Sequence, residues 1–229
     1  MAYLNQEIDK LLTGHVDILR FVDISGLDVR QNRGLPNAIL IGIGVNPQFI
    51  KMVSDHTNYI HTNEDEYAQT EKRAGVIADK LAKALIERGY KALSQSDRGL
   101  MKENAFDYYT KTSVLPHKTI AILAGLGWIG KNNLLITPEY GAAQCLGSVL
   151  TDAPLYVYCH DPNHSKCGKC TVCVNTCHKK ALKGRDWNRF ISRDDIINVS
   201  ECNACLRACL NFSIKHRKCV SSFRENNYF

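Results

Sequence analysis

The chain has 229 residues, of which 45% are hydrophobic and 23% are charged, as in an ordinary globular protein. This composition excludes a disordered or collagen-like chain. The formal net charge is +6, a mild basic excess that could attract nucleic acid or another anion. The longest apolar runs, 38–44 and 119–127, are shorter than the roughly 18 residues of a membrane helix. With no secretion signal recognised at the amino terminus, we expect a cytoplasmic protein without a membrane partner.

The first half of the chain mixes helical and strand patterns. The spacing of Leu4, Ile8, Leu11 and Leu12 predicts an amphipathic helix, and a strand-like stretch follows at 16–22. The run NAILIGIGV has the length and composition of a buried central strand. Residues 63–90 predict a long helix that ends at Gly89, with Val76, Ile77, Leu81, Leu85 and Ile86 as its apolar positions.

Two later stretches also have strand character, namely LLIT before Pro138 and LGSVLT before Pro154. The element order is α/β or α+β. Around Cys159 the apolar patterning stops, and the sequence becomes polar and rich in cysteine. We therefore predict two domains, 1–158 and 159–229. The second has too little aliphatic content for an independent core, so bound clusters would organise it.

Ten cysteines are the outstanding feature of the composition, and none precedes Cys145. Eight of them lie between Cys167 and Cys219, a crowding that indicates metal ligation rather than a disulfide scaffold. The first run has the spacing Cys-x-x-Cys-x-x-Cys-x-x-x-Cys and consists of Cys167, Cys170, Cys173 and Cys177. This spacing is typical of a four-iron, four-sulfur cluster, because three thiolates wrap one cubane while the fourth serves a second cluster. Zinc is the weaker alternative, since zinc knuckles need no third cysteine within the turn.

A second run repeats the last three positions of that motif, with Val199 where its first cysteine would stand. Crossed ligation, as in two-cluster ferredoxins, predicts two ligand sets. One set is Cys167, Cys170, Cys173 and Cys209. The other is Cys177, Cys202 and Cys205, with Cys219 as its fourth member. We interpret Cys145 and Cys159 as ordinary thiols.

The sequence GLGWIG matches the dinucleotide-binding pattern Gly-x-Gly-x-x-Gly and follows the apolar stretch KTIAILA. A Rossmann turn requires a helix after the third glycine, whereas KNNLLITPEYG follows here. Two interpretations remain. The glycines could allow close approach to a flat or anionic ligand, with Trp128, Lys131 and Asn132 beside it. Alternatively, they form a tight turn that packs Trp128 into the core.

The stretches LPHKTIAILAGLGWIGKNNLLITPEYG, LGSVLTDAPL and CGKCTVCVNTC closely resemble epoxyqueuosine reductases and, more distantly, corrinoid-dependent reductive dehalogenases. The resemblance runs from about residue 115 to 209 and implies that the chain is a short, divergent member of this group of proteins. It implies a nitroreductase-like, cobalamin-binding α/β domain followed by a ferredoxin-like module with two 4Fe-4S clusters. It also implies that the corrin lies against Gly125, Leu126, Gly127, Trp128, Gly130, Lys131 and Asn132.

The chain departs from the family pattern at several positions. Lys111 stands where epoxyqueuosine reductases carry a catalytic Asp, and residues 190–192 stand where they carry a cluster cysteine, which makes Cys219 the substitute ligand. The prolines that follow two cluster cysteines are replaced by His178 and Leu210. The extended carboxyl-terminal region that helps those enzymes engage tRNA is absent from this sequence. These departures favour a substrate other than epoxyqueuosine tRNA.

Dehalogenases use a Tyr beside a basic residue as proton donor, because the basic group lowers the pKa of the phenol. By that resemblance, the candidates near the cobalt are Tyr67, Tyr108, Tyr109, Lys111 and His117. Each also has a structural interpretation. Tyr67 could simply pack, and Lys111 could be a solvated surface residue. His117 could be a core histidine, a contact to the corrin or a cobalt ligand.

Three functions follow from these observations. The first is a cobalamin-dependent iron-sulfur oxidoreductase that passes electrons through two clusters to a corrinoid cobalt and acts on a small-molecule substrate. The second is an electron-transfer or corrinoid-reducing carrier without an organic substrate. The third is a true epoxyqueuosine reductase, for which tRNA would be the partner. A ferredoxin or flavodoxin would be the redox partner, and a docking surface for it could include Lys179, Lys180, Lys183 and Arg185.

Overall fold

The computed structural model describes residues 2–55, 59, 61–107, 109–110, 112–161 and 164–202. The chain divides into two compact units, each built from several segments. The first unit comprises 1–44, 67–126 and 145–161, and the second comprises 45–66, 127–144 and 162–229. The predicted domain boundary at residue 158 stays a prediction. In the described part of the chain, no helix is both long and apolar enough to cross a membrane.

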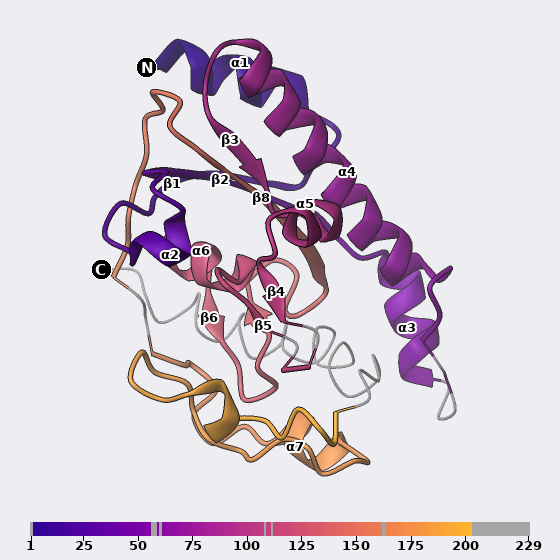
Figure 1. Cartoon of the computed structure of the whole chain (residues 1–229). Coiled ribbons are helices and arrows are strands. Elements are labelled where there is room, and N and C mark those ends of the chain that lie inside the picture. The colour runs from indigo at the N-terminus through magenta and orange to yellow at the C-terminus, as the bar shows by residue number, and fades with distance from the viewer. Residues whose placement is uncertain are drawn as a thin grey trace, which may run out of the picture. The chain divides into compact units, whose positions relative to one another are not determined.

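The first unit is built on a four-stranded sheet with the order β1-β2-β8-β3 (Figure 1). β2 and β8 are the inner strands, and each is eight residues long and buried along most of its length. β1 runs antiparallel to β2 with Phe21 opposite Ile39, and β3 runs antiparallel to β8. The strands are β1 (Ile18–Asp23), β2 (Asn37–Gly44), β3 (Ala92–Ser94) and β8 (Gln144–Thr151). The two predicted strands NAILIGIGV and LGSVLT are thereby confirmed.

Helices α1 (Ala2–Leu12) and α4 (Glu66–Glu87) lie on one face of this sheet (Figure 1). Apolar side chains of both helices form one core with Ile39 and Ile41 of β2 and Val149 of β8. α4 ends shortly before Gly89, whose φ of +88° requires the left-handed conformation that glycine adopts without strain. The predicted helices are confirmed, although three residues assigned to their apolar faces are exposed: Leu11, Val76 and Ile86.

The opposite face of the sheet carries α6 (His117–Leu123), which contacts β1 and β2 (Figure 1). Residues 120–123 of this helix are buried. The apolar stretch KTIAILA is therefore helical, and the strand-turn-helix order of a Rossmann motif is not formed. The smaller elements of this unit are α2 (Val29–Asn32), α5 (Asp97–Lys102), β4 (Phe106–Asp107) and β5 (Thr112–Ser113).

The second unit has little regular secondary structure within its described residues. Its elements are α3 (Pro47–Asp55), β6 (Trp128–Ile129), β7 (Leu135–Ile136), α7 (Val172–Thr176) and a 3-10 turn at Arg193–Asp195. β6 and β7 form a short antiparallel hairpin in which Trp128 pairs with Ile136. The predicted LLIT strand is thus present, as one arm of that hairpin. The remaining chain of this unit is held by turns and isolated hydrogen bonds.

Candidate functional site

The first cysteine run folds as a turn followed by one short helix. The backbone N–H of Cys170 donates to the Cys167 carbonyl at 2.9 Å, and Gly168 between them has a φ of +52°. Cys173 lies on α7, and the N–H of Cys177 donates to its carbonyl at 3.1 Å. Cys167, Cys173 and Cys177 are buried, whereas Cys170 is partly exposed. The Cys-x-x-Cys spacing therefore produces a compact turn, and three of its four cysteines are buried.

The thiols of this turn interact electrostatically. Burial, with a smaller contribution from the neighbouring Cys167 and Cys170 as potential thiolates, raises the pKa of Cys173 to about 12. A bound iron centre reverses this effect, because the metal charge stabilises deprotonated sulfur. Soft thiolate ligands at this spacing suit an iron-sulfur centre. Among the described residues, no three Cys, His, Asp or Glu side chains converge as a ready-made metal site, so the cluster assignment depends on spacing and burial.

A small core surrounds these thiols. Cys173 and Cys177 pack with Ala181, Leu182 and Ile197, and the partly buried Cys170 and Cys202 border the same core. Cys202, the first cysteine of the second run, thus borders the same hydrophobic core as members of the first run. Val199 borders this core as well. The predicted ligands Cys205, Cys209 and Cys219 lie outside the described residues.

The glycine motif surrounds β6 of the hairpin β6–β7. Gly125 and Gly127 precede this strand, and Gly130 follows it. A Cβ added at Gly127 would overlap the carbonyl oxygen of Ile136 on the paired strand. At Gly125, with a φ of +69°, an added Cβ would lie 2.9 Å from the imidazole ring of His160. These glycines are therefore required by the packing of the chain itself. Corrin contacts at Gly125, Leu126, Gly127 and Gly130 stay a prediction.

Trp128 and Asn132 are buried side chains of the same loop. Trp128 is 5% exposed and packs against Cys167, Ile136 and Ala142, as the turn interpretation predicted. Asn132 is 3% exposed, and its Nδ2 has no hydrogen-bond partner among the described residues. A buried amide N–H without an acceptor is costly, and a carbonyl or other acceptor on a bound group would satisfy it. The Asn132 amide is therefore a feature of the loop that suits a ligand directly.

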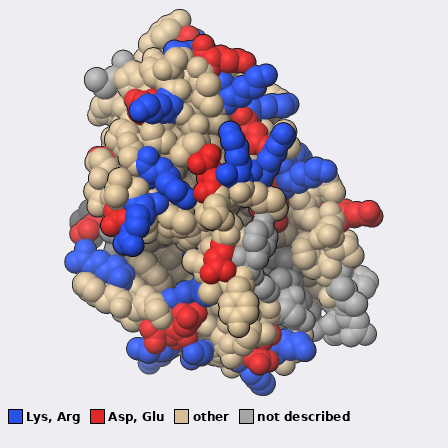
Figure 2. All heavy atoms as spheres, in the orientation of Figure 1, with Lys and Arg blue, Asp and Glu red and all other residues tan. Residues whose placement is uncertain are grey.

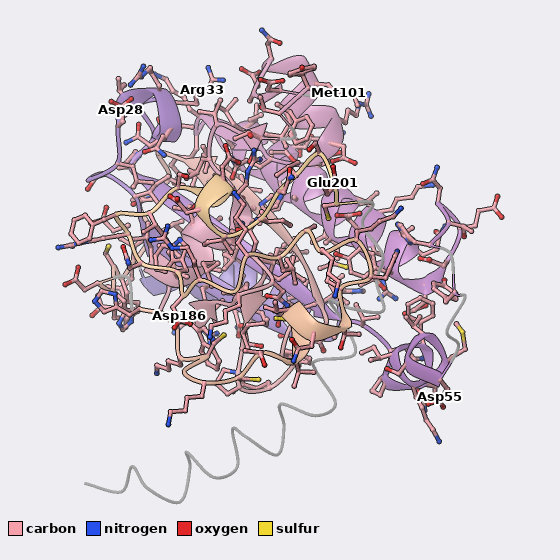
Figure 3. The ribbon with its side chains drawn as sticks, turned by 90° about the horizontal axis from the view of Figure 1, so that it is seen from below. Asp28, Arg33, Asp55, Met101, Asp186 and Glu201 are labelled. Atoms are coloured by element: carbon pink, nitrogen blue, oxygen red, sulfur yellow. The ribbon has the colours of Figure 1, made fainter. Side chains whose placement is uncertain are left out.

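Lys131 connects the glycine loop to the cysteine turn. Its side chain is 7% exposed, and its Nζ donates to the Gly168 carbonyl at 2.6 Å. A carboxylate oxygen, Oδ1 of Asp186, lies 3.7 Å from this Nζ. Asp186 is labelled in Figure 3. Its predicted role as a corrin contact stays a prediction, while the structure gives the ammonium group a partner within this chain.

His117 begins α6 and takes part in a buried chain of hydrogen bonds. Gln95 Nε2 donates to the Leu115 carbonyl at 3.0 Å, and Gln95 Oε1 accepts from the Ser148 hydroxyl. Because that hydroxyl has only one hydrogen, its oxygen accepts from His117 Nδ1, which lies 2.9 Å away. His117 is thus held as the Nδ1–H tautomer, with its lone pair on Nε2. Desolvation lowers its pKa from 6.5 to about 4, so the ring is neutral at pH 7.

The structure places the tyrosine candidates in different surroundings. Tyr67 lies in the first turn of α4 and is partly buried, and its backbone carbonyl is 3.7 Å from Cys145 Sγ. Tyr109 is 96% exposed, and its N–H donates to the carboxylate of Asp107 at 2.8 Å. Tyr108 and Lys111 lie outside the described residues. The proposed catalytic roles of these side chains stay predictions.

Sequence reasoning missed the partners that hold these candidates. Gln95 and Ser148 orient His117, yet they are 53 positions apart in the chain. Gly168 and Asp186 surround the ammonium of Lys131 and carry no motif that assigns them this role. Ser148 falls in a predicted strand, but strand periodicity does not indicate a hydroxyl that bonds to a distant imidazole.

The sequence is similar to curated epoxyqueuosine reductases. It is 46% identical to that of Gloeobacter violaceus over 74 residues, which are 32% of this chain and 23% of the relative. It is 41% identical to that of Synechocystis over 98 residues, which are 41% of this chain and 33% of the relative. These alignments cover about a third or less of each relative. No family model matches the chain. The resemblance to epoxyqueuosine reductases is confirmed.

Solved structures extend the likeness over nearly the whole chain. A catabolic reductive dehalogenase matches 90% of this chain and 32% of its own, with a TM-score of 0.62 and 15% identity. Epoxyqueuosine reductase from Streptococcus thermophilus matches 88% of this chain and 57% of its own, with a TM-score of 0.53 and 16% identity. At this identity the likeness shows the fold alone. The mixed α/β fold predicted from the sequence is confirmed by this likeness.

Proposed function

We propose that this chain is an epoxyqueuosine reductase-like oxidoreductase with two 4Fe-4S clusters held by its cysteine runs and a corrinoid held by its nitroreductase-like region. The clusters supply one-electron transfer when bound, and the corrinoid supplies a nucleophilic cobalt centre. A reductive dehalogenase of B12-dependent dehalogenation supports the corrinoid, since its structure matches 90% of this chain with a TM-score of 0.59. The substrate is a small molecule rather than epoxyqueuosine tRNA.

The cysteine turn carries this proposal. Three cysteines of the motif lie within one compact turn, in which the N–H of Cys170 donates to the Cys167 carbonyl and the following Cys173 is buried on α7. Cys202 borders the same small core and brings the start of the second run to it. Such a group of thiols, with no disulfide among the described residues, suits metal ligation better than structural packing.

Two polar side chains, one in each compact unit, are candidates for contact with a bound cofactor: His117 in the first unit and Asn132 in the second. His117 offers a neutral Nε2 lone pair, because its Nδ1–H is engaged by Ser148. Asn132 offers a buried N–H donor that lacks a partner in the described chain. Either group would help to orient a bound cofactor, while a tyrosine or Lys111 would supply a proton to the substrate.

Anaerobic reconstitution with iron, sulfide and cobalamin, followed by gel filtration and metal counting, tests the proposal. We expect about eight irons per chain, as for two four-iron clusters, and cobalt that co-elutes with the protein. Electron paramagnetic resonance should show a cobalt(II) signal distinct from that of free cobalamin. Eight irons without retained cobalt would remove the corrinoid part and leave an electron relay.

A carrier function is the second candidate, and the position of Tyr109 favours it. This side chain is 96% exposed and is not an enclosed proton donor. A chain that reduces or carries a corrinoid for a partner needs no such donor. The docking surface proposed for a redox partner is exposed, but Arg185 pairs with Asp195 at 3.2 Å and Lys183 donates to a backbone carbonyl. Cobalt retention without turnover of any halogenated or epoxide substrate would support the carrier.

True epoxyqueuosine reductase activity is the third candidate. One structural relative is an epoxyqueuosine reductase with a tRNA stem loop, and it matches 90% of this chain with a TM-score of 0.54. On the face shown in Figure 2, Lys and Arg side chains are interspersed with Asp and Glu. A mixed surface of this kind provides no broad basic patch for a nucleic-acid backbone. This candidate is tested by complementation of a strain that lacks epoxyqueuosine reductase activity. Restoration of queuosine in that strain would establish it.

A further inference from the structure

Lys131 presents a buried positive charge to the backbone of the cysteine turn. Its Nζ donates to the Gly168 carbonyl at 2.6 Å, and Gly168 directly follows Cys167 in the chain. The side chain is 7% exposed, so water screens the ammonium group poorly. Within the described second unit, this contact joins the hairpin loop after β6 to the first cysteine motif.

The partners of this ammonium group do not neutralise it fully. Lys carries three N–H donors, and one of them is used by the neutral Gly168 carbonyl. Asp186 is the carboxylate partner, but its oxygen lies 3.7 Å away and its side chain is 48% exposed. Because a buried charge is costly unless it is compensated, the site favours further negative charge nearby.

The cysteine turn would supply that negative charge when it holds iron. Cys167, Cys170 and Cys173 must be deprotonated to act as ligands, and a cluster with four thiolate ligands is anionic. Reduction adds one more negative charge. A fixed cation beside the cluster therefore stabilises the reduced form more than the oxidised form.

We propose that Lys131 is a positioning residue for the iron-sulfur centre of the first cysteine run, where it anchors the turn through Gly168 and raises the reduction potential. This inference rests on the proposed function, since it requires that the turn holds a cluster. It assigns the charged residue of the Gly-Lys-Asn segment to the electron-transfer centre rather than to the corrinoid alone. The residue acts through the turn and through its electric field, and it is not a ligand.

The chain contains a matched control for this charge. Lys169 lies in the same turn, next to Gly168, and has the same side chain, but it is exposed to solvent. Solvent screening should reduce its effect on the cluster. A comparison of the two lysines thus separates a specific buried charge from the general basic character of the turn.

The test is a redox titration of the reconstituted full chain, followed by electron paramagnetic resonance. Lys131→Met should lower the midpoint potential of one cluster and leave the other unchanged. Lys131→Arg should retain most of the wild-type potential, and Lys169→Met should match the wild type. The readout is the potential itself, so it does not depend on any substrate being known.

Several results would overturn the inference. An unchanged potential in Lys131→Met, or an equal decrease in Lys169→Met, would each show that the buried charge has no specific role. If Lys131→Met loses its iron, Asp186→Asn decides, because removal of the partner carboxylate should raise the potential. An unchanged or lower potential in that variant overturns the inference. A wild-type chain that binds no iron would instead overturn the proposed function, and the inference with it.

Discussion

The four-stranded sheet and the cysteine-bearing segment at 164–202 are stabilised in different ways. The inner strands β2 and β8 are buried along most of their length and share a core with α1 and α4. The cysteine-bearing segment has one five-residue helix, and its small core combines Ala181, Leu182 and Ile197 with thiols. Hydrophobic burial thus accounts for the sheet, whereas the proposed function predicts that the cysteine-bearing segment depends on what its thiols bind.

Loss of a cluster ligand should have the largest effect and should separate the two regions. Cys173→Ser removes the most buried thiol of the motif, so we expect loss of about four irons per chain, as for one cluster. Amide hydrogen exchange should then accelerate across 164–202 and stay slow in β2 and β8. Cys159→Ser, at an exposed cysteine outside both runs, is the control. Full iron retention in Cys173→Ser would contradict the ligand assignment.

Truncation of the sheet core should produce the opposite pattern. Ile41 is 0% exposed and packs in the core that β2 shares with α1 and α4. Ile41→Ala should lower the free energy of unfolding by about 2–5 kcal/mol, because it leaves a cavity, and should leave the iron content unchanged. Leu11→Ala, at a residue that is 58% exposed, should change stability by about 0.5 kcal/mol or less. Urea denaturation measures both, and equal effects would contradict the proposed core.

The glycine hairpin offers an intermediate case. Gly127→Ala should destabilise the protein by about 1–3 kcal/mol, because the new methyl group would overlap the Ile136 carbonyl of the paired strand. Gly26→Ala is the control, since nothing lies within 4 Å of a Cβ at that position. Thermal unfolding without added cofactor is the measurement. A loss of stability seen only in the presence of cobalamin would assign the glycine to ligand binding instead.

The pH dependence of the sheet region should show an effect that is confined to acidic conditions. The pKa of His117 is lowered from 6.5 to about 4 by burial, so the unfolded chain binds its proton more tightly than the folded chain. Its stabilising contribution is therefore full above about pH 6.5 and is lost as the pH falls toward 4. His117→Gln should flatten the stability profile in this window, whereas His15→Gln, at an exposed histidine, should not. Identical slopes for the two variants would disprove the lowered pKa.

Much of the fold followed from local patterns. Apolar spacing predicted α1 and α4, and continuous apolar runs predicted β2 and β8. The patterns that predict these elements are set by residues close together in the sequence. The stretch that became α6 was ambiguous, because a short apolar run suits a buried strand and a buried helix equally. Its packing against β1 and β2 belongs to the tertiary structure.

The spacing of the thiols in the cysteine turn was readable from the sequence, because a motif within eleven residues depends on local chain geometry. Tertiary structure alone decided which partners the polar candidates have. Lys131 meets Gly168 across 37 positions, and His117 meets Ser148 across 31. Such contacts depend on how distant segments pack, and no periodicity in either segment encodes the other. The thiol spacing is therefore local information, whereas the hydrogen bonds and charges around the polar candidates are set by the fold.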